Sequence, residues 1–213
     1  MNQNQSLDNT LLLFSTPVFV CNKYSNIVEV HDTTNEQLNT RENIGGNLSS
    51  TETNVLNLES YSTIRNRIMS GLEEYINNVL FIKPEHEFYI TQSWLNFNPP
   101  RSSHHRHNHS NSLISGVYYI DTAPEDSITF VSHYSSNTIT NNATLQIDVS
   151  EYNITNSNIW TVPVKNNDII FFPSTLLHEV SPNNSDKNRI SLSFNVFVKG
   201  NLGTTITLNE LNL

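Results

Sequence analysis

The chain has 213 residues, with 11 Lys and Arg against 20 Asp and Glu, and therefore carries a formal net charge of -9 at pH 7. This acidic balance argues against a direct nucleic-acid ligand, because surfaces that bind DNA or RNA are basic. A lone cysteine, Cys21, excludes an internal disulfide framework and fits a reducing cytoplasm, and no apolar run approaches the roughly 20 residues needed to cross a bilayer.

The N-terminal region predicts a strand, a polar connection and one helix. We expect the strand over residues 11–20, interrupted by Pro17, and a helix fragment followed by a loop over residues 32–53. Residues 61–81 place apolar side chains at steps of one, three and four, the pattern of an amphipathic helix that covers a sheet. Residues 1–83 would thus support the sheet that the remainder of the chain builds.

Short β-branched or aromatic runs dominate residues 84–200, separated by Pro, Asn, Ser and Asp turns. Many short strands without intervening helices predict antiparallel pairing in a sandwich or barrel. We therefore expect a mainly β fold in a single domain over residues 1–213, a jelly-roll-like double sheet with one or two helices packed outside. The expected strands span residues 88–98, 113–121, 127–132, 144–149, 159–164, 168–172 and 189–198.

Four of the eight histidines lie within six positions, at His104, His105, His107 and His109. On a strand, residues two apart face the same side, so His107 and His109 can together hold a transition metal if a third ligand comes from a neighbouring strand. The same segment also fits a solvated loop with adventitious metal affinity. A register with His105 as the first ligand and His107 as the second stays open as an alternative.

His178 is the candidate for the third ligand, because it follows a buried apolar strand and a turn. A lone histidine in that position is more often structural. Eleven residues later, Arg189, Ser191, Ser193 and Asn195 alternate with apolar residues, so one face of this strand is polar. Such a face can line a cavity, where the planar fork of the arginine suits a carboxylate, or it can face solvent.

These motifs, taken in order, resemble the Fe(II)- and 2-oxoglutarate-dependent oxygenases, and most closely an uncharacterised group found in marine bacteria and cyanophages. The resemblance covers about residues 90–198 and implies a double-stranded β-helix, a form of jelly roll. The matching motifs are Trp94 and Asn96, Pro99–Pro100, His107 and His109, Ser115–Tyr119, Phe172–Ser174, His178 and Arg189–Asn195.

The resemblance also implies roles for single residues. His107 and His178 match the two histidine ligands of iron, and His109 stands at the third ligand position. Arg189 matches the arginine that pairs with the distal carboxylate of 2-oxoglutarate, with Ser191 and Tyr119 assisting. Further residues expected to line the cavity are Trp94, Asn96 and Asn195. The implied reaction is a prolyl-hydroxylase-like oxidation by O2 of an unknown peptide or small molecule, with release of succinate and CO2, in the host cytoplasm if a phage encodes the chain.

One position departs from the family pattern, because the usual third ligand is a carboxylate and residue 109 is a histidine. Three neutral imidazoles leave the iron more positive. Two other interpretations therefore stay open: a cupin-type three-histidine metalloenzyme that does not use 2-oxoglutarate, and a non-catalytic jelly-roll binding or virion protein. Arg189 separates them, since only the oxygenase needs a cation facing the metal.

Overall fold

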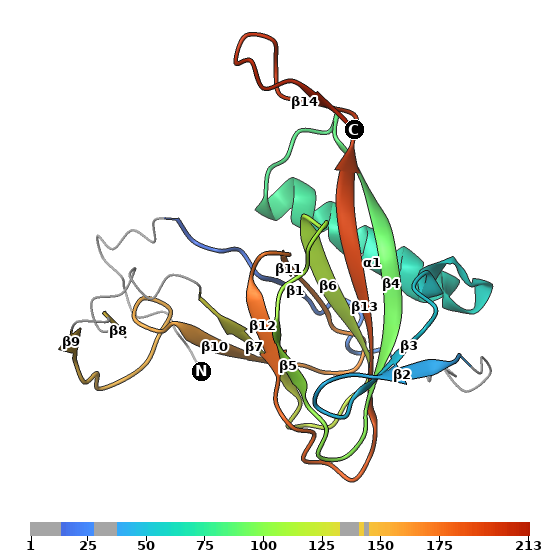
Figure 1. Ribbon diagram of the computed structural model, residues 1–213, viewed down its shortest axis with the longest axis vertical. Coiled ribbons are helices and arrows are strands. Elements are labelled where there is room, and N and C mark those ends of the chain that lie inside the picture. Colours follow the sequence, from blue (N-terminus) through green and yellow to red (C-terminus); the bar gives the residue numbers. More distant parts are fainter. Residues whose placement is uncertain (1–13, 28–37, 133–140, 143–144) are drawn as a thin grey trace.

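A computed structural model describes residues 14–27, 38–132, 141–142 and 145–213, and its architecture is two antiparallel sheets with one α-helix outside (Figure 1). The larger sheet has the order β1 (Phe19–Cys21), β11 (Ile169–Pro173), β6 (Ile114–Asp121), β13 (Arg189–Lys199), β4 (Glu87–Asn98), β3 (Leu48–Ser50) and β2 (Thr40–Glu42). The smaller sheet has the order β10 (Ile159–Pro163), β7 (Ser127–Val131), β12 (Leu177–Val180) and β5 (His104–His107). This arrangement confirms the predicted mainly β jelly roll.

Two short hairpins lie outside these sheets, β8 (Asn141–Asn142) with β9 (Leu145–Gln146), and β14 (Asn201–Leu202) with β15 (Leu211–Asn212). Two 3₁₀ turns, η1 (Val55–Asn57) and η2 (Glu59–Tyr61), lead into the helix. None of the helices in the described ranges has the length and apolar character that crossing a bilayer requires.

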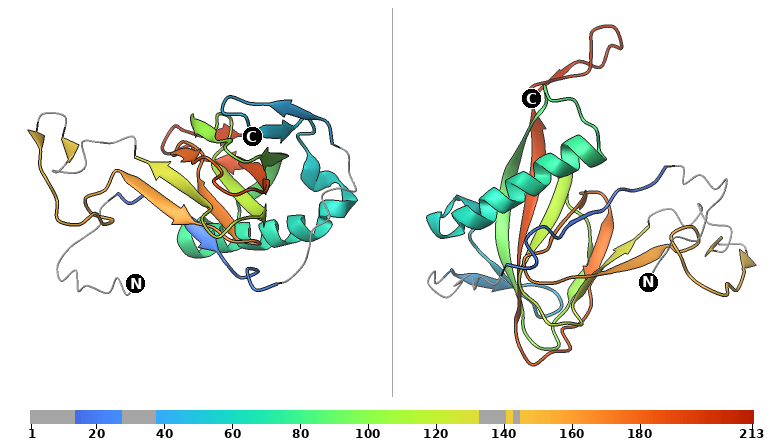
Figure 2. Two further views of the ribbon diagram at one scale, coloured as in Figure 1. Left: turned by 90° about the horizontal axis from the view of Figure 1, so that it is seen from below. Right: turned by 180° about the vertical axis from the view of Figure 1, so that it is seen from behind.

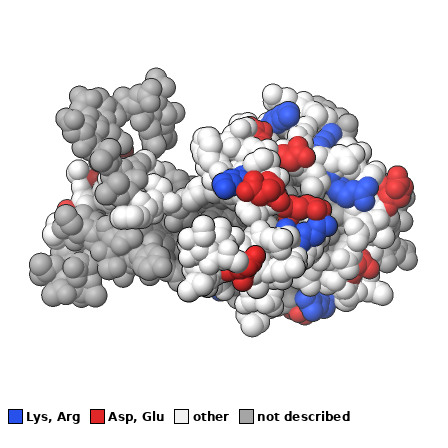
Figure 3. Space-filling view, turned by 90° about the horizontal axis from the view of Figure 1, so that it is seen from above, with Lys and Arg blue, Asp and Glu red and all other residues white. Residues whose placement is uncertain are grey.

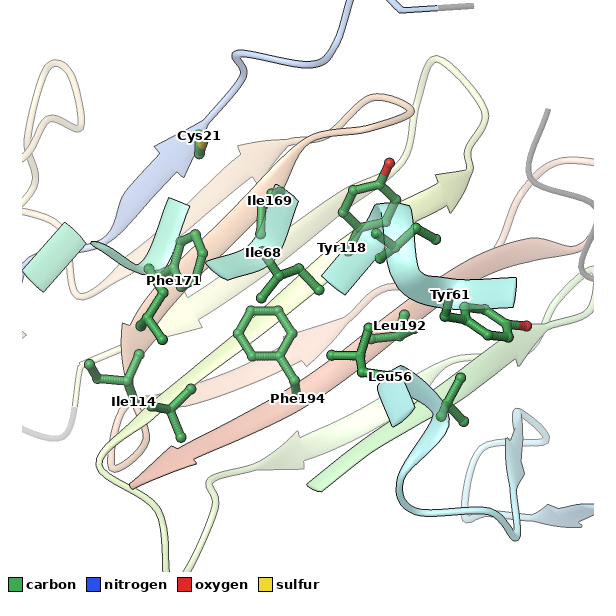
Figure 4. Packing of buried hydrophobic residues seen from close by; sticks show 14 of the residues in the cluster. Cys21, Leu56, Tyr61, Ile68, Ile114, Tyr118, Ile169, Phe171, Leu192 and Phe194 are labelled. Atoms are coloured by element: carbon green, nitrogen blue, oxygen red, sulfur yellow. The ribbon is translucent and has the colours of Figure 1, made fainter. Parts of the chain in front are cut away.

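The helix α1 (Ser62–Glu74) continues into a π-helical turn, η3 (Tyr75–Val79), within the predicted range, and crosses the outer face of the larger sheet (Figure 2). Its apolar stripe packs on alternate residues of β6, β11 and β13, so that Phe171 and Phe194 lie against Ile68 (Figure 4). Burial of each such side chain is worth about 1.5–3 kcal/mol. The helix therefore holds the larger sheet rigid on the side away from the candidate site.

Strand β6 is buried on both faces, which explains why Val117–Ile120 shows no alternation of apolar and polar residues. Ile114 and Tyr118 face the helix, while Val117 and Tyr119 enter a second cluster with Ile128, Phe130 and Phe172 between the two sheets. Gly116 is required where β6 passes Phe194, because a Cβ there would lie 2.3 Å from Cζ of that ring. The inner face of the larger sheet is thereby left to the second cluster and to the polar residues of β13.

Three strand and helix predictions need correction. The described part of residues 32–53 forms no helix: β2 and β3 form a hairpin there, and Gly45 and Gly46 adopt the positive φ angles of its turn (104° and 80°). The strand expected over residues 11–20 begins only at Phe19, with residues 11–13 outside the described ranges. The strand expected over residues 144–149 is limited to Leu145–Gln146, with residue 144 outside the described ranges.

Candidate metal centre

The smaller sheet brings three histidines together. Strands β5 and β12 pair antiparallel with His107 directly opposite His178. His109 lies beyond the end of β5, so its position depends on a turn and not on strand alternation as expected. The backbone N–H of His109 donates to the carbonyl oxygen of Ser174 at 2.9 Å, which ties this residue to the turn between β11 and β12.

Each of these three side chains offers one ligand nitrogen, and the three atoms lie within 4.8 Å of one another. The ring centroids are 4.3 Å apart for His107 and His178 and 5.2 Å apart for each pair that includes His109. Two nitrogens bound to one ion at about 2.1 Å must lie within roughly 4 Å of each other, so small side-chain rotations would complete the site. The arrangement could hold one transition-metal ion through three imidazole ligands.

Backbone carbonyls fix which ring nitrogen is available. The Nδ1–H of His107 donates to the oxygen of His105 at 2.7 Å, and the Nδ1–H of His178 donates to the oxygen of Leu176 at 3.0 Å. A carbonyl can only accept, so Nδ1 carries the proton in both rings and Nε2 is left as the ligand atom. Both rings are therefore oriented for metal binding before any ion arrives.

The environment also keeps the imidazoles neutral. Burial, together with the neighbouring histidines, lowers the pKa of His178 to about 3 and the pKa of His109 to about 4. Burial also lowers the pKa of His107. A metal binds the neutral ring, so near pH 7 these residues are already in the form that coordinates.

His109 is held by two residues that the sequence had placed in the cavity. Its ring stacks on Trp94, with centroids 5.7 Å apart, and hydrogen-bonds to the side chain of Asn195. Ser115 donates its hydroxyl to Oδ1 of Asn195 at 2.9 Å. Trp94 lines the cavity as predicted, whereas Asn195 lies behind His109 and supports it.

The structure does not bring the alternative histidine register together. His105 is exposed and does not belong to the group of converging ligand atoms. His104, which the sequence did not single out, lines the cavity and stacks on His107 with centroids 4.4 Å apart. Burial, with the neighbouring histidines, lowers its pKa to about 3.

Across the cavity, strands of the larger sheet contribute Arg189, Ser191 and Tyr119. Arg189 is 3% exposed, and its Nη1 forms an ion pair with Oδ1 of Asp126 at 3.0 Å. Its Nη2 is buried without a hydrogen-bond partner among the described residues. Tyr119 is buried beside this guanidinium, and the desolvation raises the pKa of its hydroxyl. An unpaired donor of a buried arginine is costly, and an incoming carboxylate would satisfy it.

The cavity between the histidines and Arg189 is lined by residues that were predicted and by others that were not. Asn96 lines it as expected, and its amide donates to the hydroxyl of Ser193 at 2.9 Å. Asn98 also lines it and was not among the predicted residues. Asn98 continues the alternation of Trp94 and Asn96 along β4, so strand periodicity could have found it. Asp126 lies in a turn before β7, where no pattern marks it.

A second, larger cavity lies beside the metal centre. It has a volume of ≈ 480 Å³, against ≈ 30 Å³ for the space between the histidines and Arg189. Phe130 and Trp160 line it, and the sheet register puts His107, His178, Phe130 and Trp160 in one row across four strands. Its lining, which has no charged side chain among the described residues, also includes Thr16, Val18, Val131, Ser132, Ile154, Ser157, Asn158, Val162, Thr175 and Leu176.

Comparison with known proteins connects this geometry to one family. Residues 92–195 match the family model described as "Putative 2OG-Fe(II) oxygenase", where 2OG is 2-oxoglutarate. This segment contains all three histidines and Arg189. No curated protein sequence matches the chain.

Solved structures share the fold at low sequence identity. HygX from Streptomyces hygroscopicus, solved with nickel, 2-oxoglutarate and hygromycin B, is 10% identical, with a TM-score of 0.56 over 85% of this chain and 82% of its own. The epimerase SnoN from nogalamycin biosynthesis, in complex with Fe3+, alpha ketoglutarate and nogalamycin RO, is 13% identical, with a TM-score of 0.51 over 77% and 69%. A prolyl-4-hydroxylase from Pseudomonas putida is 20% identical over 73% and 71%, but its TM-score of 0.45 is too low to argue for a substrate.

Proposed function

We propose that the chain is a 2OG-Fe(II) oxygenase, as the family match over residues 92–195 supports, in which iron binds His107, His109 and His178 while 2-oxoglutarate pairs with Arg189. The observation that carries the proposal is the convergence of three neutral imidazoles opposite a buried arginine that has an unpaired Nη2. The donor set suits iron, because imidazole is a ligand of borderline softness that Fe(II) accepts.

Iron(II) with 2-oxoglutarate supplies the oxidation of a substrate by O2, with release of succinate and CO2. The residues of this chain bind and orient the participants. Nη2 of Arg189 would donate to the distal carboxylate of the co-substrate, and Ser191 and Tyr119 line the same space. The buried position of Arg189 strengthens that pairing by excluding water.

The space for the co-substrate is narrow as the side chains stand, since ≈ 30 Å³ holds only about two water molecules. A lining side chain must therefore move when 2-oxoglutarate binds. His104 is the candidate, because its ring stacks on His107 inside the cavity and is only partly buried. His104 does not belong to the three histidines whose ligand atoms converge.

The larger cavity is the proposed place of the substrate. Its volume of ≈ 480 Å³ suits a small molecule or one side chain of a peptide, and it adjoins the metal centre through Phe130. Its aromatic and hydroxyl-bearing lining favours an uncharged group with an apolar surface. Prolyl-hydroxylase-like chemistry on a peptide would fit these dimensions.

Two further assignments rest on the sequence. The resemblance to oxygenases of marine bacteria and cyanophages supports such a source for the chain. The buried free thiol of Cys21 supports a reducing cytoplasm as its location, that of the host if a phage encodes it. Cell fractionation checks the location, and recovery of the protein outside the cytoplasm would contradict it.

Metal titrations of single variants test the proposed ligands. His107→Ala and His178→Ala should each reduce Mn(II) or Fe(II) affinity at least about tenfold, because each removes one of three ligands. His105→Ala is the matched control from the same strand and should bind metal like the unmodified protein. Equal losses in all three variants would indicate a diffuse histidine-rich loop and contradict the site.

A further inference from the structure

Asp126 is a buried carboxylate that the proposed reaction does not use. Its Oδ1 pairs with Nη1 of Arg189 at 3.0 Å, and both side chains are 4% exposed. Its Oδ2 accepts the backbone N–H of Ala123 at 2.8 Å, and its carbonyl oxygen accepts the N–H of Val164 at 3.0 Å. Asp126 lies behind the guanidinium, outside the lining of the metal cavity, and is fixed there by these contacts.

The formal charges of the site explain why a carboxylate beside Arg189 is needed to make the site neutral overall. Where iron has two histidine ligands and one carboxylate ligand, the dication, the ligand carboxylate, the 2-oxoglutarate dianion and one arginine sum to zero. Here the third ligand would be His109, and a metal-bound imidazole is neutral, so the same sum would leave one excess positive charge in a buried site. The carboxylate of Asp126 removes that excess.

We propose that Asp126 is a positioning residue for Arg189 and supplies, behind the arginine, the negative charge that His109 does not supply at the metal. This inference rests on the proposed function, since it takes iron and 2-oxoglutarate as the occupants. Asp126 also allows Arg189 to be buried before the co-substrate arrives, because a buried arginine without an anion is destabilising. It holds Nη1 and leaves Nη2 for the incoming carboxylate.

The inference predicts opposite effects for two single substitutions on 2-oxoglutarate binding. His109→Asp adds a negative charge at the metal and should weaken binding of the dianion by about tenfold. This is the effect of repulsion between two unit charges about 10 Å apart in an effective dielectric near 20. Asp126→Asn leaves the guanidinium unpaired, so the protein without co-substrate should unfold at a lower temperature and bind 2-oxoglutarate more tightly. The double variant, with both His109→Asp and Asp126→Asn, brings the sum of formal charges back to zero. It should bind 2-oxoglutarate with an affinity within about threefold of that of the unmodified protein.

Calorimetry of 2-oxoglutarate binding to the Mn(II)-loaded full chain tests these four proteins under anaerobic conditions, with thermal unfolding recorded for each. Asp121→Asn is the matched control, because it removes an exposed carboxylate at the end of β6 and should change affinity less than about twofold. A purely structural role of Asp126 predicts lower stability without tighter binding and without rescue in the double variant, and that result would overturn the inference.

Two outcomes separate this inference from the proposed function. If the unmodified Mn(II)-loaded protein binds no 2-oxoglutarate, the proposed function itself fails. If Asp126→Asn does not fold, His109→Asp and His109→Asn decide the question with Asp126 intact. Weaker binding by His109→Asp than by the uncharged His109→Asn supports the charge balance, and equal binding by the two overturns it.

Discussion

At the scale of single residues, the histidines of the centre differ from ordinary surface histidines in their protonation. Their burial between the two sheets disfavours the charged ring, which lowers the pKa of His178 to about 3 and the pKa of His109 to about 4. A group with a lowered pKa stays neutral as the pH falls through 6.5, the value for an exposed imidazole. Protons therefore compete with the metal only in more acidic solution.

This protonation predicts a weak pH dependence of metal binding. Between pH 7.5 and 6.0, an exposed histidine loses about fourfold in its neutral fraction, so three of them would cost roughly fiftyfold in affinity. The buried centre should change its Mn(II) affinity by less than about twofold over the same interval, as measured by calorimetry. A synthetic peptide of residues 101–110 serves as the control and should show the large loss. A comparable loss in the folded protein would mean that its histidines are solvated.

Some residues of the centre were predictable and others were not. Arg189, Ser191 and Ser193 stand out because strict alternation along β13 separates them from Leu192, Phe194 and Val196, and the structure keeps that separation. Family resemblance identified His178, which local pattern alone would have left as a structural histidine. Asp126 could not be found, since its partner lies 63 positions away and a buried ion pair leaves no periodic signal.

At the scale of elements, long apolar strands were predicted well and short polar strands were not. Strands β4, β6, β7, β10, β11 and β13 lie within two residues of their expected bounds because their burial imposes a repeated apolar pattern. Strands β2, β3, β5 and β12 have few apolar residues, and only pairing with neighbouring strands makes them extended. The metal ligands lie on or beside such strands, so the element that carries the site was the least visible in the sequence.

The uncharged, partly aromatic lining of the cavity beside β7 and β10 predicts that this cavity binds neutral aromatic compounds. In a Trp94→Phe variant, Trp160 is the one remaining tryptophan of the two in the chain. Its fluorescence should be quenched saturably by 1-naphthol, because the uncharged cavity accepts a neutral aromatic ring. The anion 1-naphthalenesulfonate should bind at least about tenfold more weakly, since no cation lines the described cavity wall. Equal binding of the two compounds would contradict an uncharged substrate group.

At the scale of the whole molecule, the two sheets have separate tasks in the proposed chemistry. The smaller sheet provides His107 and His178, whereas the larger sheet provides Tyr119, Arg189 and Ser191. Helix α1 supports the larger sheet from outside, so both sides of the cavity are fixed by extensive packing. Iron and 2-oxoglutarate would therefore bridge the two sheets.

The molecular surface offers no single dominant charge on the face shown in Figure 3. Basic and acidic side chains are interspersed there, although the chain as a whole carries a formal net charge of -9. Inside the fold, the buried guanidinium of Arg189 pairs with Asp126 through Nη1 and keeps Nη2 as a free donor. Recognition of an anion thus belongs to the interior of the fold.

Anaerobic titration of the protein with Fe(II) and 2-oxoglutarate tests the central claim most directly. When the keto acid chelates iron held by the three histidines, a weak charge-transfer band should develop in the visible spectrum and saturate at one equivalent of each. Arg189→Lys keeps the positive charge but loses the planar fork, so the band should require a higher concentration of 2-oxoglutarate. The expected loss of binding free energy is about 1–3 kcal/mol, and the metal affinity should stay unchanged. Metal binding without any such band would contradict the oxygenase account and favour a cupin-type centre that does not use 2-oxoglutarate.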